Sequence, residues 1–263
     1  MKQETYLEQR DKLVVKANEL IQKSRFNLSL QQQKIVLYLI SQIMPQDDDF
    51  KLYSFTIPEF CRVCGITVES GKNYQDVKNA IKEIADKSLW IRLPNGKSTL
   101  VRWIEKPYID DKSGVIDIRL DADMKPYLLQ LKENFTEYEI IYTLHFKSKY
   151  SIRLYELCKS IHYNDLEEYH RRYSIEELRQ LLGAESYTVF KDFRRRVLEP
   201  AIDEINEYSD KEVNYQTITQ GRKVIGIELF VKSKETAEVL KIRATIEKEM
   251  GTDQITLWDY LKK

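Results

Sequence analysis

The basic run over residues 191–196 offers the clearest chemistry in this sequence. It reads KDFRRR and lies in the N-terminal half of a helix predicted over about 187–207. Guanidinium groups bind phosphate oxygens and the guanine edge, so these arginines indicate a nucleic-acid-binding face. A solvated charged face is the plain alternative, but the position of the run within a repeated unit, described below, favours binding to DNA.

Helical periodicity predicts which of these side chains are exposed. At 100° per residue one apolar stripe forms, made of Phe190, Phe193, Val197, Ala201 and Ile205. The candidate DNA-binding residues that point away from this stripe are Thr188, Arg195 and Arg196. Lys191 lies at the border of the stripe. Arg194 falls on the stripe side, so we expect it to extend to the helix edge or to be displaced by Pro200.

The sequence GKST at 96–99 imitates the end of a phosphate-binding P-loop. A P-loop requires another glycine five residues before its second glycine, where this chain has Ile91, and it requires a strand-to-helix turn. The GKST segment lies instead at the tip of a predicted hairpin. We therefore expect no nucleotide binding, and we interpret Lys97 as a hairpin-tip cation near a DNA phosphate.

Metal-binding and catalytic patterns are weak. Cys61 and Cys64 form a CxxC pair, but a zinc site requires four ligands and the third cysteine, Cys158, is far along the chain. At i, i+3 of a short helix, the paired thiols are interpreted as core residues. The three histidines are unpaired, unlike the metal-binding histidines of nicking enzymes, and no Gly-x-Ser-x-Gly motif is present. We predict no catalytic residue, no metal and no cofactor.

Composition restricts the class of protein. Hydrophobic residues make up 42% and charged residues 32% of the 263, which is the composition of a folded globular protein. The 8 glycines leave little material for phosphate-binding loops. The 42 basic and 42 acidic residues cancel, so DNA binding has to rest on local clusters of charge. Three cysteines, no signal-peptide pattern and no long apolar run predict a cytoplasmic location without membrane contact.

An internal repeat organises the chain. Residues 55–65 read FTIPEFCRVCG and residues 173–183 read YSIEELRQLLG. Each segment has an aromatic residue, a Thr or Ser suited to capping a helix, an apolar face and a final glycine. Further along, NAIKEIAD at 79–86 resembles PAIDEINE at 200–207. Because both similarities occur in the same order, we predict two copies of one folding unit.

Each copy is predicted to contain three helices followed by a β-hairpin. The helices are expected from Ser29, over 58–64 and over 74–87 in the first copy, and over 149–163, 175–182 and 187–207 in the second. The strands are expected at 89–93, 98–104 and 115–120 in the first copy, and at 212–218 and 224–231 in the second. This order is that of a winged helix-turn-helix.

The predicted fold class is therefore α+β, with two tandem winged helix-turn-helix domains related by the internal repeat. The domains are predicted at 1–130 and 131–234, followed by a charged tail over 235–263 whose order the sequence leaves open. The first domain's long helix begins with four candidate donors to DNA phosphates, which an ordinary exposed helix start explains equally well: Lys72, Asn73, Tyr74 and Lys78.

Four segments resemble the iteron-binding family of plasmid replication initiators, whose members carry two winged-helix domains in one chain. They are NELIQKSRFNLSLQQQKIVLYLI at 18–40, SIRLYELCKSI at 151–161, DFRRRVLEPAIDEINE at 192–207 and QGRKVIGIELFV at 220–231. The resemblance implies a protein that binds repeated double-stranded DNA sites in a plasmid origin. It also implies opening of an adjacent AT-rich region and recruitment of the host initiator and helicase.

The resemblance further assigns roles to the two domains. It implies that monomers bind the repeats, while a dimer formed largely through the first domain represses the initiator's own gene. The second-domain helix with Arg194, Arg195 and Arg196 would read bases, and Arg222 and Lys223 would lie on its wing. The first domain would mainly hold the DNA backbone. The family has no ATPase site, in agreement with the incomplete P-loop motif.

Two other interpretations stay open. A winged-helix transcription regulator without an origin role would use the same residues. A nicking or joining enzyme for mobile DNA would need a metal-binding histidine pair near a tyrosine, which the sequence does not supply. Tandem repeats of about two helical turns in the DNA beside the gene would favour the initiator, and their absence would favour a plain regulator.

Overall fold

The first half of the chain is built around one long buried helix. A computed structural model describes residues 9, 11–64, 71–93, 96–161 and 168–250. In it, helix α3 (Leu30–Ser41) begins at Ser29, whose hydroxyl accepts from the Gln32 N–H while the Gln32 side chain accepts from the Ser29 N–H. This capping box produces the helix start that the sequence predicts. The rest of α3 is buried because other elements of both halves pack around it.

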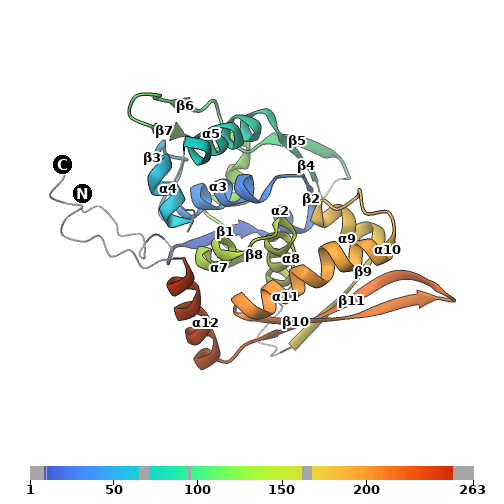
Figure 1. Ribbon diagram of the computed structural model, residues 1–263. Coiled ribbons are helices and arrows are strands. Elements are labelled where there is room, and N and C mark those ends of the chain that lie inside the picture. Colours follow the sequence, from blue (N-terminus) through green and yellow to red (C-terminus); the bar gives the residue numbers. More distant parts are fainter. Residues whose placement is uncertain (1–8, 10, 65–70, 94–95, 162–167, 251–263) are drawn as a thin grey trace.

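The other elements of the first half surround α3 (Figure 1). Its remaining helices are α2 (Asn18–Lys23), α4 (Ile57–Val63), α5 (Gly71–Asp86) and α6 (Lys125–Leu128). Its strands are β1 (Leu13–Ala17), β2 (Ser24–Arg25), β3 (Tyr53–Thr56), β4 (Ser88–Arg92), β5 (Ser98–Arg102), β6 (Tyr108–Ile109), β7 (Val115–Ile118) and β8 (Phe135–Glu139). They form three antiparallel sheets with the orders β1-β8, β2-β4-β5 and β3-β7-β6.

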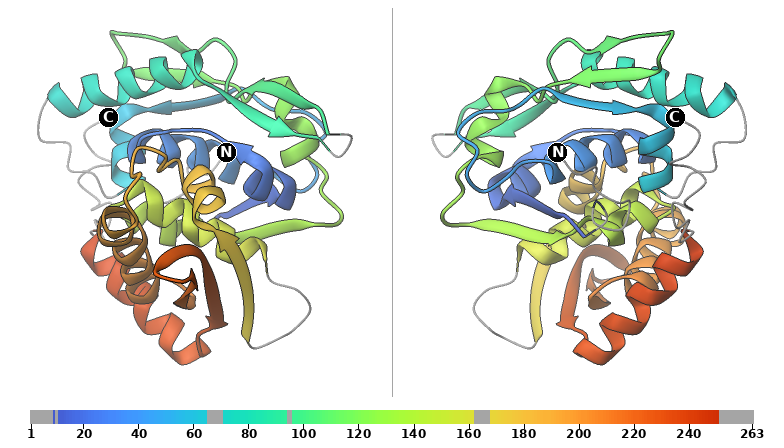
Figure 2. Two further views of the ribbon diagram at one scale, coloured as in Figure 1. Left: turned by 90° about the vertical axis from the view of Figure 1, so that its right-hand side faces the viewer. Right: turned by 90° about the vertical axis from the view of Figure 1, so that its left-hand side faces the viewer.

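The second half follows two connecting helices and repeats the order of helices and hairpin. The connecting helices are α7 (Ile140–His145) and α8 (Lys149–Ser160). The following elements are β9 (Glu168–Ser174), α9 (Ile175–Leu182), α10 (Phe190–Phe193), α11 (Glu199–Tyr208), β10 (Lys211–Gln220), β11 (Lys223–Ser233) and α12 (Thr236–Glu249). The three strands form one antiparallel sheet in the order β10-β11-β9. Figure 2 shows the two halves one above the other, with α7 and α8 between them.

The predicted α+β order is present, but the two halves pair their strands differently. In the second half, β9 leads into the short helix α9 and pairs with the hairpin strand β11. In the first half, β3 leads into α4 in the same way but pairs with β7 instead of the β4-β5 hairpin. The strand predicted at 115–120 corresponds to β7, which pairs with β3 in this sheet.

Two segments for which the sequence predicts no helix or strand are ordered parts of the fold. Strand β8 pairs along its whole length with β1, and α12 packs against α7 and α11. Ile246 of α12 is fully buried, and the guanidinium of Arg243 bonds to Glu139 at 2.7 Å. The tail is therefore a docked helix as far as Glu249. Its last residues, 251–263, lie outside the described part of the chain. The boundary proposed at residue 130 stays a prediction.

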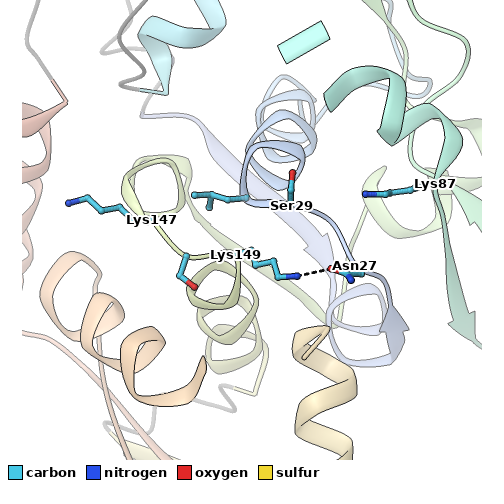
Figure 3. A pocket seen from close by; sticks show the side chains of 7 residues that line it. Asn27, Ser29, Lys87, Lys147 and Lys149 are labelled. Carbon is cyan, nitrogen blue, oxygen red and sulfur yellow. Dashed lines mark hydrogen bonds between the residues drawn. The ribbon is translucent and has the colours of Figure 1, made fainter. Parts of the chain in front are cut away.

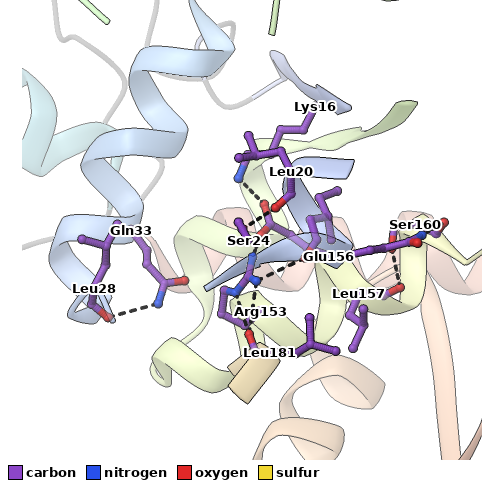
Figure 4. A network of polar contacts seen from close by, with 12 residues as sticks. Lys16, Leu20, Ser24, Leu28, Gln33, Arg153, Glu156, Leu157, Ser160 and Leu181 are labelled. Carbon is purple, nitrogen blue, oxygen red and sulfur yellow. Dashed lines mark hydrogen bonds and ion pairs between the residues drawn. The ribbon is translucent and has the colours of Figure 1, made fainter. Parts of the chain in front are cut away.

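A buried ion network joins the two halves (Figure 4). Lys16 Nζ of β1 lies 2.5 Å from Glu156 Oε1 of α8, and Arg153 Nη1 lies 3.2 Å from Glu156 Oε2. Arg153 also donates to the carbonyl of Ile21 in the first half and to that of Leu181 in α9. All three charged side chains are at most 5% exposed. One helix thereby fixes how the two halves lie relative to each other.

Candidate nucleic-acid interface

The arginine-bearing helix of the second half is continuous from Phe190 to Tyr208 but contains one π-helical turn. In that turn the Glu199 N–H donates to the Arg194 carbonyl, five residues back. The next residue, Pro200, has no N–H to donate, and its ring would clash with the carbonyl four residues earlier in a regular helix. The extra residue in the turn agrees with the displacement of Arg194 expected from Pro200, and the Arg194 side chain is exposed.

The three arginines lie on the exposed side of this helix, over a buried apolar stripe. Arg194 Nε lies 3.4 Å from the Glu199 carboxylate and Arg195 Nη2 lies 3.7 Å from that of Asp192. Surface pairs of this kind contribute about 0–1 kcal/mol, so a phosphate or a base edge can replace the carboxylate. Arg196 has no ion-pair partner among the described residues. The stripe residues that are fully buried are Phe193, Val197, Ala201 and Ile205.

The loop before this helix is held by Arg179, which sequence reasoning missed. Its Nη2 donates to the Thr188 carbonyl at 2.9 Å, and its guanidinium lies 5.4 Å from the ring centroid of Phe193. Thr188 and Lys191 are exposed on either side of the helix start. The only sequence feature that could have indicated this role of Arg179 is its position in the last turn of α9, where many helices carry a basic residue for other reasons. Arg179 thus positions the loop that presents the candidate residues.

The β10-β11 hairpin forms a wing beside the helix and extends past α10 (Figure 1). Gly221 takes a positive φ of +61° at its turn, where Arg222 and Lys223 are both exposed. At Gly226 a Cβ atom would lie 2.8 Å from the Tyr173 carbonyl, so only glycine allows β9 to approach β11 there. The wing residues expected from the resemblance therefore lie at the tip of the β10-β11 hairpin, beyond the part of β11 that pairs with β9.

Tyr74, one of the four candidates at the start of α5, is not presented to a phosphate. Its hydroxyl oxygen is buried and has no hydrogen-bond partner in the described part of the chain. Its ring packs beside Gly114, where Tyr74 Cε2 would lie 3.5 Å from an added Cβ atom. The prediction of an exposed Tyr74 donor is therefore corrected, because the ring fills space under the β6-β7 turn. The side chains of Lys72 and Asn73 lie outside the described residues.

The two other candidate lysines of the first half, Lys78 and Lys97, lie in different surroundings. Lys78 Nζ forms an ion pair with Asp111 at 2.5 Å, and this hydrogen bond to the carboxylate raises the pKa of Lys78. A phosphate would have to displace that carboxylate. Lys97 is exposed in the β4-β5 hairpin, where its carbonyl accepts from the Leu93 N–H at 2.7 Å. The GKST segment thus connects antiparallel strands and does not lead from a strand into a helix.

Side chains suited to catalysis are not gathered into a site in the described part of the chain. Cys61, Cys64 and Cys158 are buried, and burial raises the pKa of Cys61 and that of Cys158, the latter to about 12. These two thiols are therefore protonated at neutral pH. No group of three metal-ligating side chains occurs among the described residues. Within the same residues, no helix has the length and apolar character needed to cross a membrane.

Comparisons with known proteins agree with this geometry. The family model described as "Initiator Replication protein, WH1" matches residues 13–159, and "Initiator Rep protein, WH2" matches residues 174–231. A replication initiation protein of Escherichia coli is 27% identical over 208 residues, which are 76% of this chain and 64% of that protein. The chain therefore spans less than two thirds of the length of this relative.

A solved structure shares the fold. It is the crystal structure of the Pi initiator protein in complex with iteron DNA, with a TM-score of 0.70 and 19% sequence identity. The match covers 86% of this chain and 99% of the other. At this identity the likeness concerns the fold. Together with the two family models, it confirms the predicted arrangement of two winged-helix domains.

Proposed function

Because the chain belongs to the family of plasmid replication initiators with two winged-helix domains, we propose that it binds repeated double-stranded sites in a plasmid origin and initiates replication there. The observation that carries this proposal is the exposed arginine run on the second domain's long helix. A winged helix-turn-helix places this helix in the major groove, with its N-terminal residues on base edges. The DNA complex of the structurally similar Pi protein supports the proposal.

The second domain supplies sequence recognition in this proposal. Arg195 and Arg196 are exposed, with at most one weak carboxylate partner each, and a guanidinium binds guanine O6 and N7 with two parallel hydrogen bonds. Arg222 and Lys223 on the wing reach the flanking backbone. In the first domain, Lys97 contributes positive charge near a phosphate, and Lys72, Asn73 and Lys78 are assigned the same role.

Binding titrations test this division between the domains. The probe is the duplex that the wild-type chain selects from a random pool, compared with a scrambled duplex at several salt concentrations. Arg195→Ala or Arg196→Ala is expected to cost about 1–3 kcal/mol on the selected duplex and to relax preference at one base position. Lys97→Ala is expected to weaken both duplexes alike and to flatten the salt dependence by about one unit of slope.

The same arginine variants can also contradict base reading by the second domain. If they lose affinity for the selected and scrambled duplexes in equal proportion, the cluster is an electrostatic clamp. Base reading then has to be sought in the first domain. A wild-type chain that selects no sequence at all would contradict the proposed function itself.

A dimer formed through the first domain is part of the proposal, as is repression of the initiator's own gene at an inverted repeat. Trp90 and Leu100, paired across β4 and β5, are 55% and 50% exposed, which is unusual for side chains of this size and supports a contact there. We expect Trp90→Ser to shift the chain towards monomers in sedimentation experiments. Contact with the host initiator and helicase proteins rests on family membership.

A further inference from the structure

A hollow of about 510 Å³ opens on the surface between the first half and the turn that joins α7 to α8 (Figure 3). The residues that line it come from three separate parts of the chain and include three lysines: Asn27, Ser29, Leu30, Lys87, Lys147, Ser148 and Lys149. We call this hollow the lysine seat. Its three lysines are supplied by the residue after α5 and by the turn between α7 and α8, and all of its lining residues lie within the stretch 13–159 that matches the first winged-helix model.

Two of the lysines are held in position by neutral groups. Lys149 Nζ donates to Asn27 Oδ1 at 2.7 Å, and Lys87 Nζ donates to Gln32 Oε1 at 2.8 Å. An amide oxygen orients an ammonium group without cancelling its charge. The Lys147 side chain is exposed and has no hydrogen-bond or ion-pair partner among the described residues. The structure therefore holds two cations in place, while the Lys147 side chain points away from them (Figure 3).

Among the described residues, only one carboxylate near the lysine seat forms an ion pair with one of its lysines. The Glu204 carboxylate accepts instead from the backbone N–H groups of Lys147 and Ser148, at 2.8 and 3.2 Å. Glu83 lies 3.6 Å from Lys87 Nζ but is 60% exposed, so that pair is weak. Burial lowers the pKa of Lys149, Glu185 opposes this effect, and the charge of Lys87 lowers it further.

The lysine seat lies beside the loop that leads into the arginine-bearing helix. Tyr150, next to Lys149, packs edge to face against Tyr187 at 6.2 Å between ring centroids. Tyr187 directly precedes Thr188 in the loop that leads into the arginine-bearing helix. On the other side, Lys87 directly follows α5, the long helix of the first domain. The candidate DNA contacts of α5 lie towards its other end, so the duplex that would bring a phosphate to the seat is the one contacted by the arginine-bearing helix.

We propose that the lysine seat binds a backbone phosphate of the duplex that the arginine-bearing helix contacts. The inference rests on the proposed function and adds a contact outside the arginine-bearing helix and its wing. A phosphate oxygen accepts hydrogen bonds from ammonium groups, and its charge relieves the repulsion between Lys87 and Lys149. The contact is independent of sequence, so it contributes to affinity and to the position of the protein on DNA.

The test uses the Lys147→Gln/Lys149→Gln variant of the full chain and a mixed-sequence duplex of about 40 base pairs, long enough to reach both domains. Each lost phosphate contact lowers the slope of log affinity against log salt by about 0.9, which is about eightfold in affinity at 0.1 M salt relative to 1 M. We expect a loss of one to two such contacts. The control variant, Lys241→Gln/Lys248→Gln, removes the same charge at exposed lysines of α12, outside the seat, and is expected to keep the wild-type slope.

Further arms separate the possible failures. If the double variant no longer shows the circular dichroism of the wild type, Lys147→Gln alone replaces it. This side chain has no partner among the described residues, and the salt slope of the single variant then tests the contact. Calorimetric titration with inorganic phosphate tests whether the seat binds free phosphate instead of a phosphate of the DNA backbone. If the double variant loses phosphate binding but keeps the wild-type slope on DNA, the seat binds free phosphate and the inference is overturned.

The two proposals fail in different ways. A wild-type chain that binds no duplex contradicts the proposed function, whatever the variants do. A wild-type chain that binds DNA with a steep salt dependence, while the seat variant matches both wild type and control, contradicts the lysine seat alone. Equal flattening in the seat and control variants would show a general effect of charge and would also overturn the inference.

Discussion

Replacing Glu156 with glutamine tests whether the buried ion network holds the two halves together. Glu156 is the only anion in the network, between the Lys16 and Arg153 cations, and its side chain is 1% exposed. Glu156 Oε1 also accepts from the Tyr138 hydroxyl at 2.6 Å. The substitution keeps the shape of the side chain but leaves two buried cations without an opposite charge.

Breaking a buried ion pair by removing one partner costs about 3–5 kcal/mol, because the remaining charge is uncompensated. We expect a loss of that size in the free energy of unfolding of Glu156→Gln. Lys16→Met is the informative comparison, since Glu156 then keeps Arg153 and the buried trio becomes neutral. Replacing a buried charge by an apolar side chain of similar volume is often close to neutral, so we expect Lys16→Met to cost much less.

Urea unfolding followed by circular dichroism at pH 7 measures both values. The pH dependence gives a second reading. Burial lowers the pKa of Lys16 and Glu156 opposes this effect, so the pKa falls further in Glu156→Gln. The unfolded chain then binds more protons than the folded one between that pKa and about 10.4, and the stability of the variant rises with pH across this window. A cost below about 1 kcal/mol, or equal costs for Glu156→Gln and Lys16→Met, would refute this reasoning.

Three further predictions concern other positions. Burial lowers the pKa of His145, so the folded state loses stability as the pH falls from about 6.5 through that lowered pKa, and His145→Gln is expected to remove this part of the pH dependence in thermal melts. Gly183→Ala and Gly221→Ala both place alanine at a positive φ, at about 1–2 kcal/mol each, but only Gly183 would bring a Cβ atom within 3.0 Å of the Phe26 carbonyl, so it is expected to cost more in urea unfolding. Ile246→Ala is expected to cost about 2–5 kcal/mol if α12 is docked as described, whereas a value below about 0.5 kcal/mol would indicate an undocked tail.

The starts of helices could be predicted from the sequence because their chemistry is local. Ser29, Thr56 and Ser174 each accept from a backbone N–H three residues on, and each helix begins where the sequence indicates. The short hairpin connections are equally local, since turn residues fix them within a few positions. The helix around Pro200 shows the limit of such rules, because a regular period does not include the π-helical turn.

Features that join distant parts of the chain could not be predicted in this way. The pairing of β1 with β8 and the contact of Arg153 with both Ile21 and Leu181 each connect residues far apart in the sequence. No local pattern marks them. The lysine seat has the same origin, because Lys87 and Lys149 look like ordinary surface lysines until the fold brings them together. At the start of α5, periodicity alone did not show that Tyr74 turns inward.

Selection of duplexes from a random pool by the full-length chain, followed by comparison with the DNA beside its gene, tests the central claim most directly. The account predicts that selection converges on one sequence, that this sequence occurs there as tandem repeats of about two helical turns, and that Arg195→Ala/Arg196→Ala abolishes the convergence. A pool that stays random under wild-type selection would contradict the claim, as would a selected sequence that is not repeated beside the gene.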